Sequence, residues 1–258
     1  MPMKRVCVVQ ARMGSTRLPG KVLRDLAGRP MLSQLLRRLR ACRSLDEIVI
    51  ATSSAGSDDP IVELARSERV PVFRGSETDV LARILAAARS TDADVVVRVT
   101  GDCPLLDPDV TDRVVDELTG NAGSADYASN VLRRTFPRGL DVEAMFLDTL
   151  LRVHRFARTD SEREHVTLAI RSERPDLFLT RSVESDTDDS DLRWTVDEES
   201  DLRLIEQLYQ ALGLADRIVP YRAVVDHVRQ HPELASINAG ITTWTPQGPP
   251  GPTEGLTE

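Results

Sequence analysis

Short runs of consecutive apolar residues recur at intervals through the first half of the chain. Three of them are rich in β-branched side chains and show no alternation of polar and apolar positions: "RVCVVQ" (5–10), "EIVIAT" (47–52) and "ADVVVRVT" (93–100). Such runs are typical of strands that are buried on both faces, as in a parallel sheet covered by helices. The pattern therefore predicts three buried strands in this half.

The segments between these runs have helical periodicity. Apolar residues recur every three or four positions in segments 31–42, 79–89 and 107–118, with polar residues opposite, which predicts amphipathic helices. In the last segment Asp107 is the expected N-cap and Pro108 the first helical residue. The alternation of strands and helices predicts an α/β fold, with a mainly parallel sheet, right-handed crossovers and helices on both faces in three layers.

The second half of the chain is less regular. Its expected strands are 126–130, 139–146 and 192–197, and its expected helices are 160–172, 198–212 and 222–231. We expect one domain over residues 1–240, with an irregular excursion from the main sheet at about 125–190. Residues 241–258 are rich in Pro, Gly and Thr and have little to bury, so we expect a disordered tail there.

Composition and charge narrow the class of protein. Hydrophobic residues make up 41% of the 258 positions, and 33 basic against 41 acidic residues give a net charge of −8. This balance argues against a general nucleic-acid binder or a binder of anionic membranes. No run approaches the roughly 18 apolar residues of a membrane-spanning helix. The three cysteines lie far apart without a C-x-x-C pair, so we expect a reduced, cytoplasmic protein with neither a disulfide framework nor a zinc site.

The first candidate for chemistry comes directly after the first expected strand. In "QARMGSTRLPGK" a flexible Gly14-Ser15 turn is surrounded by Arg12, Arg17 and Lys21. Guanidinium forks, an ammonium group and backbone N–H groups are the donors that bind a polyphosphate. The loop is neither a G-x-x-x-x-G-K-[ST] loop nor a G-x-G-x-x-G loop. The alternative is a plain strand–loop–helix turn with solvated cations.

Two aspartates end two other expected strands. Asp102 follows the strand "VVVRVT", and Asp197 ends "LRWTVD". The carboxyl ends of parallel strands share one edge of a sheet, where ligands collect, and carboxylates there suit Mg²⁺ bound together with substrate phosphates. For Asp102 the alternative is a Gly-Asp turn. For Asp197 a metal ligand and a structural carboxylate remain equally open, and residues 198–201 are expected to cap the next helix.

Weaker signals lie between these sites. Arg138, Asp141 and Glu143 surround Gly139 in "FPRGLDVEAM", which indicates a polar wall around a ligand. His165 lies on an expected helix, one turn after Glu162. A single helical histidine is either structural or catalytic, and periodicity does not separate the two.

Several of these motifs, taken together, resemble a known family. "ARMGSTRLPGK" resembles the A-R-x-G-S-x-R-x-x-x-K signature of cytidylyltransferases that make CMP-activated sugars, such as acylneuraminate and 3-deoxy-manno-octulosonate cytidylyltransferases. "FRGSETDVLAR", "RVTGDCPLLD", "TFPRGLDVEAM", "EREHVT" and "LRWTVDEESDL" are similar to motifs of the spore-coat polysaccharide cytidylyltransferase-like group. The likeness runs from about Val6 to Leu204. It implies a nucleotide-diphospho-sugar transferase fold, with CTP as donor and Mg²⁺ as cofactor.

The resemblance also implies roles for individual residues. Those that match the triphosphate loop are Arg12, Gly14, Ser15, Arg17 and Lys21, and those that match the metal-binding aspartates are Asp102 and Asp197. Those expected near the nucleotide and the sugar are Arg74, Gly75 and Asp79. Those expected to face the acceptor are Arg138, Asp141, Glu143 and His165. The central motif here reads Thr-Gly-Asp where the octulosonate enzymes have Q-G-D, so the resemblance does not carry their acceptor over to this chain.

The sequence thus predicts a CTP-dependent nucleotidyltransferase. An oxygen of a sugar acid, phosphate or phosphonate attacks the α-phosphorus and expels pyrophosphate, while Lys21, Arg17 and Asp102 stabilise the reacting charges. The expected partners are CTP, a small-molecule acceptor and a second copy of the chain. The alternatives are a glycosyltransferase of the same fold that uses a nucleoside diphosphate sugar, and a nucleotide-binding scaffold without catalysis.

Overall fold

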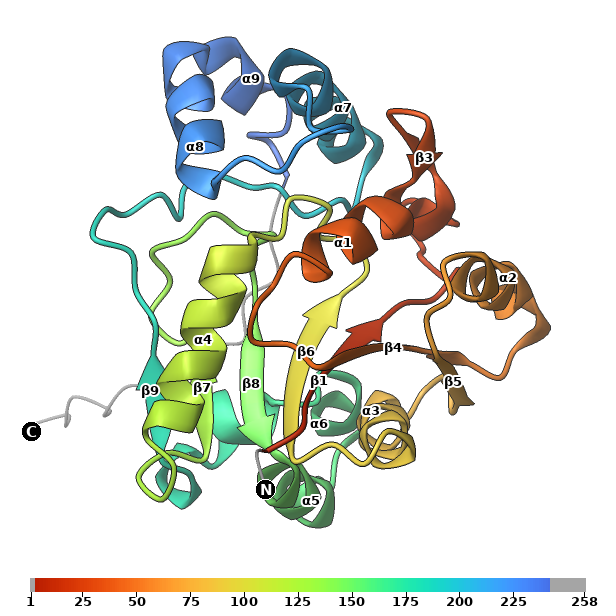
Figure 1. The fold of residues 1–258 in the computed structure, drawn as a ribbon, viewed down its shortest axis with the longest axis vertical. Coiled ribbons are helices and arrows are strands. Elements are labelled where there is room, and N and C mark those ends of the chain that lie inside the picture. The colour runs from red at the N-terminus through yellow and green to blue at the C-terminus, as the bar shows by residue number, and fades with distance from the viewer. Residues whose placement is uncertain (1–2, 242–258) are drawn as a thin grey trace, which may run out of the picture.

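A seven-stranded mixed sheet forms the centre of the computed structural model, which describes residues 3–241 (Figure 1). The strands lie in the order β5-β4-β1-β6-β8-β7-β9. β1 pairs with β4 and β6 in parallel, and β4 pairs with β5 in parallel, whereas β8 is antiparallel to both β6 and β7. The bounds are β1 Arg5–Gln10, β4 Glu47–Ser53, β5 Val72–Gly75, β6 Val95–Thr100, β7 Tyr127–Ser129, β8 Glu143–Phe146 and β9 Thr180–Ser182.

Helices cover both faces of this sheet, which confirms the predicted three-layer α/β architecture. The side chains of α1, α2, α4, α7 and α8 share one apolar core with Cys7 and Val9, and those of α3 and α5 share the other with Val6 and Val8. Figure 1 shows α7, α8 and α9 gathered beyond the tip of β6. The bounds are α1 Met31–Leu39, α2 Asp59–Ser67, α3 Val80–Ser90, α4 Pro108–Gly120, α5 Leu147–Phe156, α6 Asp160–Glu164, α7 Glu199–Leu212, α8 Tyr221–Gln230 and α9 Pro232–Ser236.

Shorter elements connect these layers. A hairpin of two short strands precedes α1. Single helical turns lie after the first loop, between β4 and α2, and in the connection from α5 to β9. Their bounds are β2 Asp25–Leu26, β3 Arg29–Pro30, η1 Lys21–Leu23, η2 Gly56–Asp58, η3 Ala169–Glu173 and η4 Pro175–Leu177. Among the longer helices and the strands of the main sheet, the elements without a counterpart in the sequence prediction are β5, β9, α2, α5 and α9.

One predicted strand and one predicted helix are not regular elements in the structure. Segment 192–197 is extended but is no regular strand, because its amide groups find partners in different segments: Trp194 N–H donates to the Arg138 carbonyl and Val196 N–H to the Asp102 carbonyl. The predicted helix 160–172 is broken into α6 and the π-turn η3. The break lies at Val166, whose φ of 54° is incompatible with a right-handed helix.

The predicted single domain stays a prediction. Within the expected excursion, β7, β8 and β9 extend the main sheet. The predicted tail lies outside the described residues, apart from Ile241. No helix within residues 3–241 is both long enough and apolar enough to cross a membrane.

Gly139 allows the loop before β8 to pack directly on segment 192–197. Its φ is 101°, and a Cβ atom there would lie 2.7 Å from both Thr195 N and Trp194 C. We therefore expect Gly139→Ala to lower the free energy of unfolding by about 2–4 kcal/mol. Gly120→Ala is the matched control, because a Cβ at Gly120 meets no heavy atom within 4 Å. Urea unfolding measures both, and equal stability of the two variants would contradict the close approach.

Candidate functional site

A polar cavity of about 350 Å³ opens where β1 and β6 end. Its walls come from the loop after β1, the turn after β6, the end of α6 and the segment just before α7. In an open α/β sheet this edge is where ligands bind, because parallel strands release their following loops there. The cavity therefore brings together the sequence-predicted triphosphate loop and both predicted metal-binding aspartates.

Lys21 lies at the centre of this cavity, between the two aspartates. Its Nζ is 2.7 Å from Asp102 Oδ2 and 2.7 Å from Asp197 Oδ1. Gly20 makes the approach possible, since its left-handed φ of 68° turns the chain into η1, of which Lys21 is the first residue. The two carboxylates thus meet within reach of one cation, although they lie far apart in the sequence.

The aspartates are held by their own neighbours. The Thr100 hydroxyl donates to Asp102 Oδ1 at 2.6 Å. Asp197 Oδ2 accepts from Arg193 at 2.6 Å and lies 3.2 Å from Arg17. Arg193 is itself fixed by the buried carboxylate of Asp201, which also accepts the backbone N–H of Asp197. This network leaves each carboxylate with a defined orientation toward Lys21.

The electrostatics keep Lys21 and Asp197 ionised at neutral pH. Burial works to lower the pKa of Lys21, but the charges of Asp102 and Asp197 outweigh it and hold that pKa above its usual value. Burial works to raise the pKa of Asp197, but Lys21 and Arg193 outweigh it and hold that pKa below its usual value. The cavity therefore contains a fixed pattern of one ammonium group between two carboxylates.

Asp102 and Asp197 fit a hard divalent cation. Their oxygen atoms already hold one positive charge between them. Within residues 3–241 no cluster of three or more His, Cys, Asp or Glu side chains has the geometry of a metal site. One or two carboxylates completed by substrate phosphates are a ligand set that Mg²⁺ accepts, whereas structural zinc sites have four protein ligands, mostly Cys and His. The two carboxylates thus have the donor chemistry that a hard divalent cation needs.

The loop after β1 forms the cationic side of the cavity. Arg12, Gly14 and Ser15 line it together with Arg17. Asp58 anchors the loop, because its Oδ1 accepts the Met13 backbone N–H at 2.8 Å. Sequence reasoning missed Asp58, whose only local signal is its place between a strand and a helix.

The residues predicted near the nucleotide and the sugar do not line this cavity. Arg74 donates to the carbonyls of Ser53 and Ala55 and pairs with Asp59 at 2.7 Å. Gly75 packs so closely on the Arg83 side chain that a Cβ would lie 3.1 Å from Arg83 Cγ. Asp79 caps α3 and pairs with Arg163 beside a neighbouring cavity of about 300 Å³, whose wall includes Arg12. Asp79 thus shares the wall of the neighbouring cavity with Arg12, which also lines the main cavity.

The four residues predicted to face the acceptor do not lie together at one site. His165 lines the main cavity. Asp141 makes a bidentate pair with Arg134 at 2.7 and 2.8 Å. Glu143 is only 5% exposed and pairs with Arg98, so the expectation that it faces a ligand directly does not agree with its burial. The structure brings His165, and not the whole group, to the cavity.

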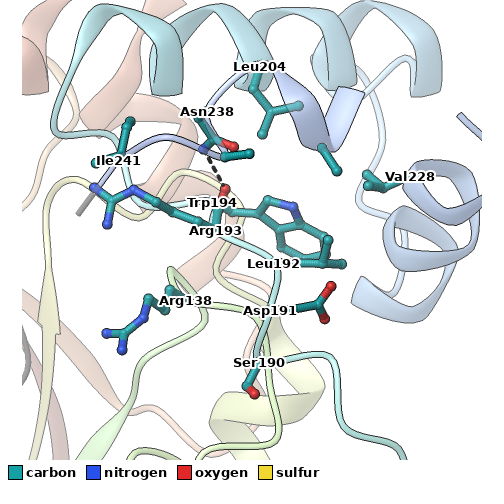
Figure 2. A pocket seen from close by; sticks show the side chains of 12 residues that line it. Arg138, Ser190, Asp191, Leu192, Arg193, Trp194, Leu204, Val228, Asn238 and Ile241 are labelled. Carbon is teal, nitrogen blue, oxygen red and sulfur yellow. Dashed lines mark hydrogen bonds between the residues drawn. The ribbon is translucent and has the colours of Figure 1, made fainter. Parts of the chain in front are cut away.

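Arg138 lines a second cavity of about 430 Å³ between segment 190–194 and the C-terminal helices. Figure 2 shows the guanidinium groups of Arg138 and Arg193 on the same side of the view, while the Trp194 ring extends the other way below Leu204. Asn238 closes this region, since its Nδ2 donates to the Arg193 carbonyl at 3.0 Å. Arg193 thereby connects the second cavity to Asp197.

Glu143 makes the stability of the protein depend on pH. Burial works to raise its pKa, but Arg98 and Arg171 outweigh burial and lower it to about 2 from 4.5. A carboxyl group with a lowered folded-state pKa stabilises the fold above its unfolded pKa, and this contribution is lost as the pH falls through the folded value. We therefore expect Glu143→Gln to cost up to about 3 kcal/mol at pH 7, and the gap to wild type to narrow between about pH 4.5 and 2. Urea unfolding at several pH values measures this gap, and a constant gap would contradict the assignment.

Comparison with known proteins identifies the relatives of this chain. The family model described as cytidylyltransferase matches residues 6–216. An uncharacterized protein of Methanocaldococcus jannaschii is 36% identical, with 93% of this chain and 96% of the relative covered. The spore coat polysaccharide biosynthesis protein SpsF of Bacillus subtilis is 35% identical, with 80% and 86% covered. The structure of a cytidylyltransferase from Leptospira borgpetersenii serovar Hardjo-bovis is 32% identical and superposes with a TM-score of 0.87 over 95% of this chain and 100% of that one.

These likenesses confirm the family predicted from the motifs, because the match covers most of the chain and includes the loop after β1, both aspartates and His165. They also agree with the observed sheet, since the superposition extends over almost the whole fold. The chain is therefore a nucleotidyltransferase and belongs to the cytidylyltransferase family.

Proposed function

We propose that this protein transfers CMP from CTP to a sugar acid or to an acceptor that bears a phosphate or phosphonate, and that it requires Mg²⁺. The acceptor oxygen attacks the α-phosphorus in line, a new P–O bond forms, and the bond to the β-phosphate oxygen breaks to release pyrophosphate. The observation that carries the proposal is the position of Lys21 between Asp102 and Asp197 at the open edge of the sheet. Family membership supports the choice of CTP.

The residues around the cavity would bind and orient the charged parts of CTP. Arg12, Arg17 and the backbone of Gly14 and Ser15 offer donors to the triphosphate. Lys21 would move from its carboxylate partners toward the phosphate oxygens and counter the charge that develops on the departing pyrophosphate. Asp102 and Asp197 would hold Mg²⁺, which when bound supplies positive charge against the α-phosphate.

Catalysis on this view is mostly positioning and neutralisation of charge. Phosphoryl oxygens carry the developing charge, which the cations of the cavity and the metal ion would counter. The carboxylates that would hold this ion are already oriented by Thr100, Arg193 and Asp201. Ligands fixed in this way need little reorganisation during the reaction, which lowers the barrier. His165, at the wall of the same cavity, is on the side proposed for the acceptor.

The test is a screen for pyrophosphate release. Each of the four common nucleoside triphosphates is combined with Mg²⁺ and with sugar acids, sugar phosphates and phosphonates in turn. We expect release with CTP and one class of acceptor only. Release of a nucleoside diphosphate from a sugar nucleotide would favour the glycosyltransferase alternative, and nucleotide binding without any product would favour a scaffold.

Two further properties belong to the same proposal. We propose a homodimer, which sedimentation equilibrium of the full chain tests directly. We also propose a cytoplasmic location, which agrees with the three cysteines being free and buried in the described residues.

A further inference from the structure

A buried polar layer lies beneath the cavity, on the face of the sheet that α3 and α5 cover. Glu143 is its centre and is only 5% exposed. The Tyr127 hydroxyl donates to Glu143 Oε1 at 2.7 Å, the Thr167 hydroxyl donates to the same oxygen, and Arg98 pairs with Oε2. A carboxylate with this many donors is fixed in position and cannot turn toward a ligand.

Arg98 connects Glu143 to a residue of the cavity wall, Gln10. Arg98 lies in β6 opposite Glu143 of β8, and its second terminal nitrogen donates to Gln10 Oε1 of β1 at 2.8 Å. A guanidinium group is only a donor, so the Gln10 atom that meets it must be the carbonyl oxygen. The amide nitrogen of Gln10 is therefore the atom left for other contacts.

Gln10 lines the main cavity beside Thr100, at the last position of β1. With its oxygen turned to Arg98, its NH₂ group becomes a donor at the floor of the cavity. His165 lies near the same guanidinium, since Arg98 is among the charges that lower the pKa of that imidazole, after burial. Gln10 and His165 thus line the same cavity, and both lie near the Arg98 guanidinium.

A strained turn ties this part of the cavity to Glu143. Val166 is buried with a φ of 54°, and Thr167 N–H donates to the His165 carbonyl across it. A positive φ is costly for a β-branched residue and persists only where surrounding contacts impose it. The hydrogen bond from Thr167 to Glu143 is one such contact. Glu143 therefore orients the wall that carries His165 as well as the floor.

We infer that Gln10 is a specificity-determining residue whose NH₂ group donates a hydrogen bond to an oxygen of the acceptor. Arg98 and Glu143 are positioning residues that hold the amide in this orientation. The inference rests on the proposed function, and it names the acceptor rather than the nucleotide because Gln10 shares its surroundings with His165. The sequence led us to expect that Glu143 faces the acceptor. Its inferred role is instead to position Arg98, which orients Gln10 toward the acceptor.

Kinetics of Gln10→Met test the donor. The variant keeps the length of the side chain but lacks the NH₂ group. Arg98 loses its contact with Gln10 but keeps its ion pair with Glu143. We expect the KM for the acceptor found in the pyrophosphate screen to rise about 10- to 100-fold, with the KM for CTP within about twofold of wild type. The exposed Gln207→Glu serves as control and should change neither value. An unchanged acceptor KM, or a rise confined to CTP, overturns the inference.

The orientation of the Gln10 amide is tested without turnover. The protein has six glutamines, and labelling them with ¹⁵N makes their side-chain NH₂ signals visible by NMR. The signal that disappears in Gln10→Met is that of Gln10. We expect this signal to shift in Glu143→Leu, which adds no glutamine, while the Gln207 signal stays in place. An unmoved Gln10 signal in a folded variant overturns the positioning by Glu143, and Arg98→Met replaces Glu143→Leu if the latter does not fold. If wild type releases no pyrophosphate but the Gln10 signal responds, the proposed function fails and the positioning stands.

Discussion

Asp102→Asn is expected to reduce pyrophosphate release from CTP by at least about 10³-fold and to leave the fold intact. The substitution keeps the size of the side chain and its contact with the Thr100 hydroxyl, but it removes one of the two negative charges that meet at Lys21. A neutral amide is a poor ligand for a hard divalent cation. Lys21 retains Asp197 as partner, so little stability should be lost.

The control for this variant is Asp109→Asn. Asp109 is an exposed residue in the first turn of α4 and lies outside the cavity. Turnover with Mg²⁺ and Mn²⁺, together with thermal unfolding, separates loss of the metal site from loss of the fold. An Asp102→Asn enzyme that works at the wild-type rate would remove Asp102 from the metal site and with it the proposed arrangement.

Lys21→Met is expected to have two opposite effects. Turnover should fall by about 10²- to 10³-fold, because the group that counters charge on the pyrophosphate is lost. Binding of Mn²⁺ to the nucleotide-free protein should instead become tighter by about tenfold or more. The reason is that the Lys21 ammonium lies 2.7 Å from both carboxylates and competes with any other cation for them.

Titration with Mn²⁺, followed by electron paramagnetic resonance, measures the second effect independently of activity. Lys4→Met provides the control, since Lys4 is an exposed residue that pairs with Glu47 away from the cavity. Weaker or unchanged binding of Mn²⁺ by Lys21→Met would mean that the two aspartates do not form the cation site. A wild-type rate would mean that Lys21 has no role in the departure of pyrophosphate.

The sequence alone determined the layered α/β architecture and the position of the main site. Consecutive β-branched residues such as those of β1 and β6 indicate strands buried on both faces, and the loops after such strands lie at one edge of a parallel sheet. That local rule was sufficient to place Lys21, after β1, near Asp102, after β6. Asp197 reaches the same place from an extended segment that is no regular strand of the sheet. The helix caps of α4 were readable for the same reason, since Asp107 and Pro108 act within one turn.

Arg98 shows a signal in the sequence that pattern reading passed over. A single charge inside the apolar run "VVVRVT" must find a partner in the core, because an unpaired buried charge is too costly. The partner is Glu143, 45 residues later. Which carboxylate it is depends on the pairing of β6 with β8, and no local pattern contains that information.

Only the tertiary structure decided what Glu143, Arg193 and Val166 do. Glu143 comes after the loop around Gly139, as a ligand-facing residue would, yet the antiparallel register with β6 turns its side chain into the core opposite Arg98. Arg193 holds Asp197 from a segment whose amides pair with distant neighbours, and Asp201 holds both residues from the first turn of α7. The reason is physical: periodicity and caps depend on interactions within a few residues, whereas the partner of a buried charge depends on strand order, register and the contacts that outweigh backbone strain.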